Sequence, residues 1–244
     1  MLNLLKKHVS VRQYTEEKIP DEVLQELCRT AQAAASSHFV QAYSIIDVID
    51  LEKREKLADY SKNPTQINSA ARVLIFCADL KRLDHAVQMH HKSIAAGTLE
   101  NFMMAVIDTT ILAQNFVIAA ESKGYGICYI GGVRNNPESI SELLSLPEYV
   151  IPIFGLTVGV PEVRNEIKPR LPVDAILHTN EYDEQKYHEL LPKYDEILSE
   201  YYATRTSNNK SVGWTEGMAQ FLSEERRTHM LDFVQSKGML TKDC

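Results

Sequence analysis

Residues 8–12, with the sequence HVSVR, combine a hydroxyl group with two side chains that can carry positive charge. His8, Ser10 and Arg12 alternate with two β-branched valines, and this spacing is typical of an extended segment. In such a segment the three polar side chains point to the same side. An arginine fork beside a hydroxyl and a histidine suits an anion, in particular a phosphate monoester.

A second basic segment lies much later in the chain, at Lys168, Pro169 and Arg170. Proline disfavours helical backbone at the residue before it, so we expect the segment to be extended, with both cations on one face. Together, the two segments could clamp a phosphate dianion. Each segment alone is also compatible with an ordinary solvated basic surface, and the residues by themselves leave both interpretations open.

Gly131 and Gly132 follow a short apolar stretch, residues 127–130. A glycine pair there either lets the backbone approach a flat ligand closely or forms a turn with positive φ, and the turn is the commoner use. Neither this pair nor residues 155–159 (GLTVG) forms the glycine-rich dinucleotide-binding motif, because the second run is not followed by a predicted helix. The pattern therefore disfavours a Rossmann domain.

Other residue types capable of chemistry form no convincing set. His85, His90 and His91 have poor spacing for a metal site and lack acidic partners. No G-x-S-x-G motif is present, and no cysteine lies in a local setting that would activate it. The sequence therefore predicts no metal site and no catalytic side chain.

The overall composition describes a globular chain with a sizeable core. With 244 residues and 44% hydrophobic content, we expect one large domain, or a compact core with an appendage. The net charge of -7 argues against nucleic acid or an anionic membrane as the main partner. The four cysteines form no C-x-x-C pair, and the first residues do not resemble a signal peptide, so we expect a cytoplasmic protein.

Hydrophobic periodicity predicts strands alternating with helices. The apolar segment 97–123 is long enough to span a membrane, but polar residues interrupt it, so we expect a helix buried on all sides within a domain or a subunit interface. This helix is a first indication of a dimer. The other predicted helices cover residues 19–35, 51–61, 136–146, 183–203 and 215–236, and the predicted strands cover residues 43–49, 72–78, 127–130 and 151–160.

Five motifs in a fixed order resemble the oxygen-insensitive NADPH nitroreductase and NADPH-flavin oxidoreductase family, part of the nitroreductase superfamily. They are residues 8–14 (HVSVRQY), Ser36 with Ser37, residues 129–135 (YIGGVRN), residues 168–172 (KPRLP) and residues 201–209 (YYATRTSNN). The resemblance extends over essentially the whole chain. Their combination is far more specific than any one motif.

This resemblance implies an α+β, nitroreductase-like fold with a central, mostly antiparallel sheet flanked by helices. It further implies an interlocked homodimer with a long buried helix and one FMN in each interface groove. We expect residues 1–175 to form the FMN-binding core. Residues 176–244 are expected to form a helical extension that packs on the core and on the dimer partner.

The resemblance also assigns roles to individual residues. The serine run is shorter here than in the family, with Ala35 before it and His38 after it. The implied contacts are His8, Ser10, Arg12, Lys168 and Arg170 for the FMN phosphate and ribityl chain; Ser36 and Ser37 near the isoalloxazine ring; Gln66 and the backbone of Tyr129, Ile130, Gly131 and Gly132 at the flavin; and Arg205 and Lys210 for NADPH, Arg205 at its 2′-phosphate.

The implied activity is a ping-pong hydride transfer. NADPH, or NADH as an alternative, would reduce the flavin, and a nitroaromatic, a quinone, free flavin or a similar acceptor would then take the electrons. Flavin N5 carries this chemistry, which agrees with the absence of a catalytic motif. Two alternatives are a dedicated FMN reductase that supplies reduced flavin to a partner and a flavin-binding sensor without turnover.

Overall fold

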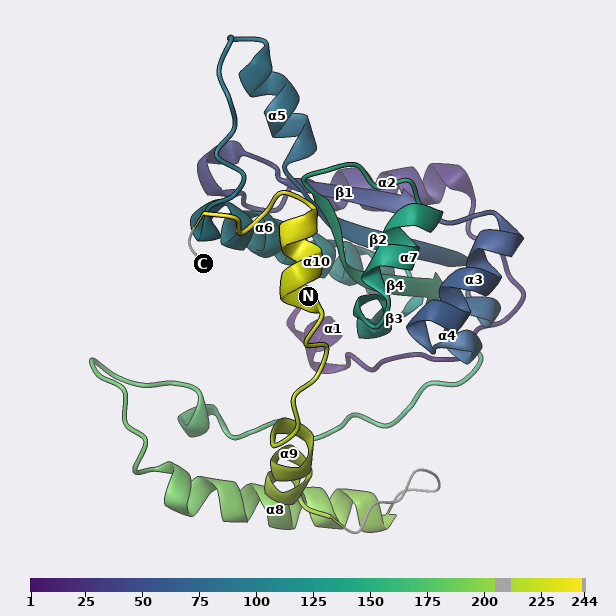
Figure 1. Ribbon diagram of the computed structural model, residues 1–244. Coiled ribbons are helices and arrows are strands. Elements are labelled where there is room, and N and C mark those ends of the chain that lie inside the picture. Colours follow the sequence, from purple (N-terminus) through teal and green to yellow (C-terminus); the bar gives the residue numbers. More distant parts are fainter. Residues whose placement is uncertain (205–211, 243–244) are drawn as a thin grey trace. The chain divides into compact units, whose positions relative to one another are not determined.

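The computed structural model describes residues 1–204 and 212–242 (Figure 1). Its contacts divide the chain into two compact units, Met1–Asn165 with Arg227–Cys244, and Glu166–Arg226. The first unit holds an antiparallel sheet between helices, and the second holds helices and irregular segments. The fold class is therefore α+β, as predicted.

The sheet has four strands in the order β1-β2-β4-β3, and each neighbouring pair is antiparallel. The strands are β1 (Tyr43–Asp47), β2 (Arg72–Asp79), β3 (Gly126–Ile130) and β4 (Val150–Gly159). The two central strands, β2 and β4, are buried along most of their length. Both faces of the sheet are covered, and this burial explains why the sequences of β2 and β4 are continuously apolar.

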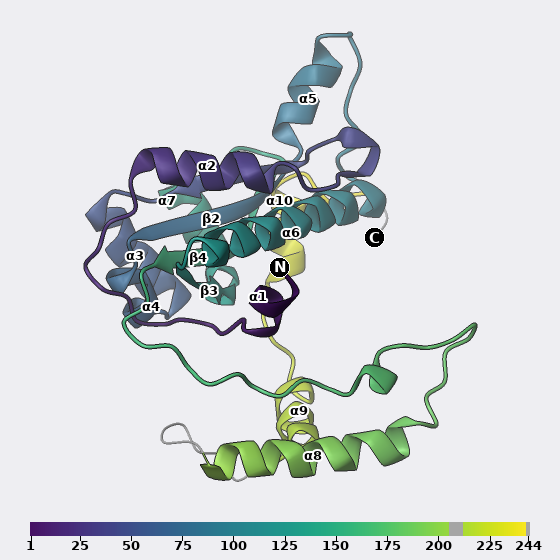
Figure 2. The same ribbon diagram turned by 180° about the vertical axis from the view of Figure 1, so that it is seen from behind.

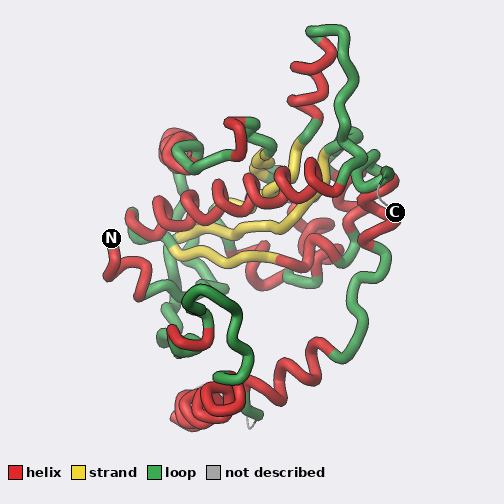
Figure 3. The backbone as a smooth tube through the Cα atoms, turned by 90° about the vertical axis from the view of Figure 1, so that its left-hand side faces the viewer, coloured by secondary structure: helices red, strands yellow, loops and turns green. Residues whose placement is uncertain are grey.

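Helices cover both faces of this sheet. One layer consists of α2 (Asp21–Ala31) and α6 (Leu99–Ser122), and the other includes α3 (Leu51–Ser61), α4 (Pro64–Ser69) and α7 (Pro137–Leu143) (Figures 1 and 2). Each layer closes its own apolar core against the sheet. Figure 3 shows the long helix α6 running along the strands.

The remaining elements are short, apart from α8. A third apolar cluster ties the C-terminal helix α10 to the first unit, because Phe233, Val234 and Met239 pack with Leu80 and Ile151. The predicted division into 1–175 and 176–244 remains a prediction. The other elements are α1 (Leu2–Lys6), η1 (Ser37–Phe39), α5 (Lys81–Gln88), η2 (Gly131–Arg134), η3 (Val173–Ala175), α8 (Tyr187–Thr204), α9 (Trp214–Leu222) and α10 (Met230–Ser236).

One expectation about the helices is wrong. Residues 215–236 do not form one helix, because α9 ends at Leu222 and α10 begins at Met230. Arg227, between them, has φ of 54°, a left-handed conformation that a right-handed helix cannot contain. Helix α6 is not buried on all sides within the chain, so its burial in a subunit interface stays a prediction.

Helix α6 leaves an apolar stripe uncovered. Leu99, Met103, Ile107 and Ile111 recur at a spacing of four residues and are 39–49% exposed. The opposite side of the helix, with Leu112 and others, packs in the core. By length and composition α6 could span a membrane, a property it shares with the core helices of soluble proteins. The exposed stripe is therefore a surface that another apolar surface would cover favourably.

Candidate functional site

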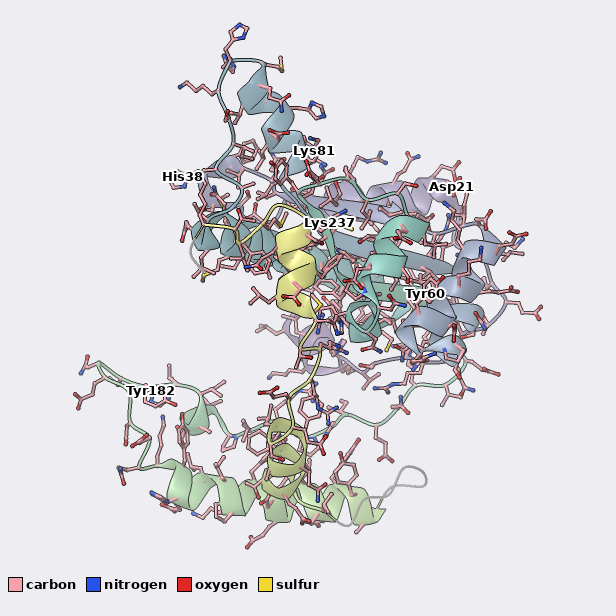
Figure 4. All side chains as sticks on the ribbon, in the orientation of Figure 1. Asp21, His38, Tyr60, Lys81, Tyr182 and Lys237 are labelled. Carbon is pink, nitrogen blue, oxygen red and sulfur yellow. The ribbon has the colours of Figure 1, made fainter. Side chains whose placement is uncertain are left out.

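A cavity of about 440 Å³ opens where β3 and η2 meet the connection between α3 and α4. Tyr60, labelled in Figure 4, marks this side of the first unit, since Ser61 and Asn63 line the cavity. Six residues predicted for the flavin line it together: Arg12, Gln66, Tyr129, Ile130, Gly131 and Gly132. The other lining residues are Ser61, Lys62, Asn63, Cys128, Asn135 and Arg227.

The backbone around Ser10 lies beside β3, as expected of an extended segment. Ser10 forms an isolated parallel bridge with Ile127, and the Val11 N–H donates to the Ile127 carbonyl at 2.8 Å. The Val11 side chain is fully buried, and the Tyr14 hydroxyl donates to its carbonyl oxygen at 2.7 Å. These contacts hold Arg12, the next residue after Val11, at the cavity.

Two of the three polar residues predicted in the segment 8–12 keep their donor groups available. Within residues 1–204 and 212–242, neither the Ser10 hydroxyl nor the Arg12 guanidinium has a hydrogen-bond or ion-pair partner. His8 differs, because its Nδ1 lies 2.6 Å from Oε1 of Glu121 at the end of α6. Ser10 and His8 do not line the cavity itself.

Gly132 is needed because two loops approach each other closely. A Cβ at this position would lie 2.1 Å from the Ser61 carbonyl oxygen and 2.4 Å from Asn63 Oδ1. At Gly131 the nearest atom to such a Cβ is Arg134 Nη2, at 3.5 Å. Neither glycine has positive φ, so the turn interpretation is wrong for this pair. The absent side chain of Gly132 lets η2 pack on the end of α3.

Gln66 is positioned by the helix that carries it. Helix α3 ends at Ser61; the next residue, Lys62, turns the chain with its left-handed backbone (φ 57°), and Pro64 then begins α4. Ile67 is buried in the core and anchors α4. Gln66 and Asn63 therefore bring two amide side chains to the cavity wall.

Sequence reasoning missed Arg227 as a lining residue. Its Nε donates to Asn135 Oδ1 at 3.0 Å, and Asn135 Nδ2 in turn donates to the Ser61 carbonyl at 3.1 Å. Burial and the nearby Arg227 charge lower the pKa of Arg134. Asn135 belongs to the YIGGVRN motif at residues 129–135, whereas Arg227 lies 92 residues further along the chain and belongs to none of the motifs.

The predicted serines lie elsewhere in the first unit. Ser36 Oγ donates to Asp108 Oδ2 at 2.6 Å, and the Ser37 N–H donates to Asp108 Oδ1 at 3.2 Å. Asp108 and Glu121 are both on α6, so at 1.5 Å per residue these serines lie about 20 Å along that helix from His8. Figure 4 accordingly shows His38, the next residue, across the first unit from Tyr60.

The loop that follows Ser37 is unusual in its backbone. His38, Phe39 and Gln41 all have positive φ, which is uncommon for residues other than glycine. The buried Asp108 carboxylate also accepts from the Ala42 N–H at 3.2 Å, so it organises both ends of this loop. Strained backbone held in this way is frequent at binding sites.

The titratable groups at the cavity favour binding over nucleophilic chemistry. Burial, with a contribution from Glu121, raises the pKa of Tyr129 to about 12, so this phenol is neutral at physiological pH. Burial also raises the pKa of the Cys128 thiol. Among the described residues, no group of three His, Cys, Asp or Glu side chains could hold a metal ion.

The second basic segment belongs to the second unit. Tyr194 of α8 donates its hydroxyl hydrogen to the Pro169 carbonyl at 2.9 Å, and Lys168 Nζ lies 5.3 Å from the centre of the Tyr202 ring. The segment is thus held against α8, while its convergence with Arg12 remains a prediction. Arg205 and Lys210 lie outside the described residues.

The residues of the first unit fit a phosphorylated, flat cofactor such as FMN. The cavity volume falls in the range of small-molecule sites, roughly 300–1,000 Å³. Arg12 offers an unpaired guanidinium for a phosphate, and Gln66 and Asn63 offer amide donors and acceptors for a polar ring edge.

Comparison with known proteins places the chain in a family. Residues 5–160 match the model described as "Nitroreductase family", and residues 168–242 match "Nitroreductase family, C-terminal domain". A relative in Pseudomonas sp. (strain G-1), named Cr(VI) reductase, is 56% identical over 96% of this chain and 97% of its own length.

Two further relatives resemble the chain over nearly its full length. The Bacillus subtilis (strain 168) protein named FMN reductase (NADPH) is 38% identical over 95% of this chain and 94% of its own. The solved structure of B. megaterium NfrA1 has a TM-score of 0.95 and 40% identity, and covers 98% of this chain and 99% of that one. By its sequence over residues 5–160 and 168–242 and by its fold, the chain belongs to the nitroreductase family.

Proposed function

We propose that the protein is an FMN-dependent oxidoreductase that uses NADPH to reduce small organic acceptors. The observation that carries this proposal is the assembly of six predicted flavin contacts, from three separate stretches of sequence, around one cavity. Support also comes from relatives named FMN reductase (NADPH), NADPH-flavin oxidoreductase and oxygen-insensitive NADPH nitroreductase.

The proposed role of residues 8–12 is to bind the phosphate end of FMN. Arg12 would form two parallel hydrogen bonds to phosphate oxygens, and Ser10 would add a hydroxyl donor. Lys168 and Arg170 would supply the remaining charge from the second unit. A phosphate surrounded by cations is held strongly because its charge is compensated as water leaves.

The other wall of the cavity would hold the flavin ring. FMN supplies the electron-transfer chemistry when it is bound. Gln66 would hydrogen-bond the polar edge of the ring, and the backbone from Tyr129 to Gly132 would lie along it. Because Tyr129 stays neutral, its ring offers an uncharged surface beside the cofactor.

We also propose a homodimer formed through the exposed stripe of α6. Leu99, Met103, Ile107 and Ile111 lie in one row on this helix, and burying such a row against a second copy removes apolar surface from water. In this arrangement Ser36 and Ser37, which lie away from the cavity of their own chain, would serve the flavin of the partner. Membership of the nitroreductase family supports the proposal, since the resemblance implies an interlocked homodimer with a flavin in each interface groove.

NADPH would enter the same groove after FMN is bound. Arg205 would contact the 2′-phosphate, and Lys210 would add a second positive charge, although without the arginine fork. These residues are proposed from the family resemblance. NADPH is a cytoplasmic reductant, which agrees with the proposed cytoplasmic location.

The electron acceptor is proposed as a class: nitroaromatics, quinones, free flavin and similar molecules. Chromate is a second candidate acceptor, favoured by the 56% identity to the protein named Cr(VI) reductase. Besides Arg12, which is assigned to the FMN phosphate, Lys62 and Arg227 line the cavity, and these two cations would attract this dianion. A dedicated FMN reductase and a sensor without turnover remain alternative functions.

The test is the absorption spectrum of the purified protein before and after anaerobic NADPH. We expect a yellow dimer with stoichiometric FMN that bleaches on addition of NADPH and recovers its colour with a nitroaromatic. A yellow protein that fails to bleach would refute the proposed enzymatic activity and would favour the flavin-binding sensor without turnover. Steady-state rates with free FMN, a nitroaromatic and chromate as acceptors would then separate the remaining functions.

The phosphate role of Arg12 has its own test. Arg12→Ala should leave a folded protein that loses FMN on dialysis, because a charge-assisted hydrogen bond contributes roughly 1.5–3 kcal/mol. Arg29→Ala, on α2 and away from the cavity, removes the same charge and should keep the flavin. Equal retention of FMN by both variants would contradict the assignment.

A further inference from the structure

Glu121 occupies a position that is unfavourable for a carboxylate. It lies in the last turn of α6, where the helix dipole repels negative charge, and its side chain is only 9% exposed. A carboxylate with so little access to water needs a hydrogen-bonded partner. Within residues 1–204 and 212–242 its only hydrogen-bond and ion-pair partner is His8, whose Nδ1 lies 2.6 Å from Oε1.

This contact fixes which nitrogen of His8 faces the helix. An ionised carboxylate has no hydrogen to donate, so Nδ1 must carry the hydrogen in the bond. Nε2 is then the nitrogen left over, and in the described part of the chain it has no hydrogen-bond partner. The imidazole is therefore held with a defined tautomer and a defined orientation.

Glu121 is not needed to hold the N-terminal segment in place. The backbone of that segment is already fastened by the Val11 bond to Ile127 and by the Tyr14 hydroxyl, which reaches the Thr157 carbonyl as well as Val11. The Glu121 bond instead restrains a single side chain, in a segment 113 residues away in sequence. Its specific effect is thus on the His8 ring.

We propose that Glu121 is a positioning residue that acts through His8 on FMN binding. The carboxylate holds Nδ1–H, so that Nε2 would be left as an acceptor for a ribityl hydroxyl of the cofactor, while Ser10 and Arg12 would donate to the phosphate. This inference rests on the proposed function. It adds a buried acid on the long helix to the flavin site, although this acid does not itself touch the cavity.

The first experiment measures FMN affinity of the apoprotein by quenching of flavin fluorescence. Glu121→Ala should weaken binding roughly tenfold, because it removes the charged acceptor of Nδ1–H and so releases the ring. Glu121→Gln should bind within about twofold of the unaltered protein, since its amide oxygen still accepts from Nδ1–H. Glu26→Ala is the control, because this exposed acid pairs with Lys123, two residues from Glu121.

A double-mutant cycle separates positioning from general structure. In a His8→Ala background, the added Glu121→Ala change should have no further effect on FMN affinity. Nitrogen NMR shifts of His8 in the apoprotein should show hydrogen on Nδ1, and Glu121→Ala should move them toward the common Nε2–H tautomer. These shifts report the pairing without cofactor or turnover.

The possible results are distinct. A tenfold loss that persists in the His8→Ala background would overturn the inference and make Glu121 a structural residue. FMN binding that Glu121→Ala or His8→Ala leaves unchanged would overturn it as well. If the unaltered protein bound no FMN at all, the proposed function itself would fail, which differs from a failure of the inference alone.

Discussion

Replacing Gly132 by alanine tests the close approach of the two loops that form the cavity. The added Cβ would lie 2.1 Å from the Ser61 carbonyl oxygen, whereas ordinary contacts begin near 3.4 Å. The oxygen and the Cβ must therefore separate by about 1.3 Å, and this requires backbone movement because the oxygen is a backbone atom and the Cβ is bonded directly to the backbone. Overpacking of this kind costs roughly 1–3 kcal/mol.

Gly131→Ala is a matched control with the same chemical change one residue away. The Cβ at position 131 would meet nothing closer than 3.5 Å, and φ of Gly131 is not positive. The free energy of unfolding of Gly131→Ala should therefore equal that of the unaltered protein or exceed it by up to about 1 kcal/mol. Urea unfolding of both apoproteins, at one protein concentration, measures the difference. For a chain of this length, about 2 kcal/mol corresponds to roughly 4–8 °C in melting temperature.

FMN affinity should follow the same order. Moving η2 away from Ser61 displaces residues that line the cavity, so Gly132→Ala should weaken FMN binding while Gly131→Ala should not. Equal stability and equal affinity for the two variants would refute the reasoning, because only the spacing at Gly132 distinguishes them.

Three further outcomes are expected. Ile107→Glu should yield a monomer in sedimentation experiments, because it buries a charge in the proposed interface. Leu51→Glu on α3 should remain a dimer. A dimer in both cases would exclude the α6 stripe as the dimer interface. Asp108→Ala should lower the free energy of unfolding by roughly 1.5–3 kcal/mol, since the donors at Ser36, Ser37 and Ala42 lose their acceptor. Asp59→Ala, on the surface, should have little effect. Equal losses in the two variants would contradict the role of Asp108 in organising the loop. Arg205→Ala should raise the NADPH KM more than the NADH KM, and a uniform rise would remove the 2′-phosphate assignment.

Local patterns in the sequence determined most of the fold. The four strands and the long helix were predicted within a few residues of their observed bounds, because apolar runs and helical periodicity follow directly from burial in a sheet or a helix. Residues 215–236 show the limit of this reasoning. Their pattern fits one helix, and no local signal marks the left-handed backbone at Arg227 that separates α9 from α10.

The sequence by itself also determined which residues to examine, since six residues predicted to contact the flavin meet at one cavity. Only the tertiary structure decided what surrounds them: the Arg227 contact with Asn135, the Ser61 carbonyl against Gly132, and the Glu121 carboxylate on His8. These partners lie far apart along the chain, and a local pattern records which face of a segment is apolar without recording which distant segment it meets. That choice is made when the whole core packs, because burial energy depends on the complete set of contacting surfaces.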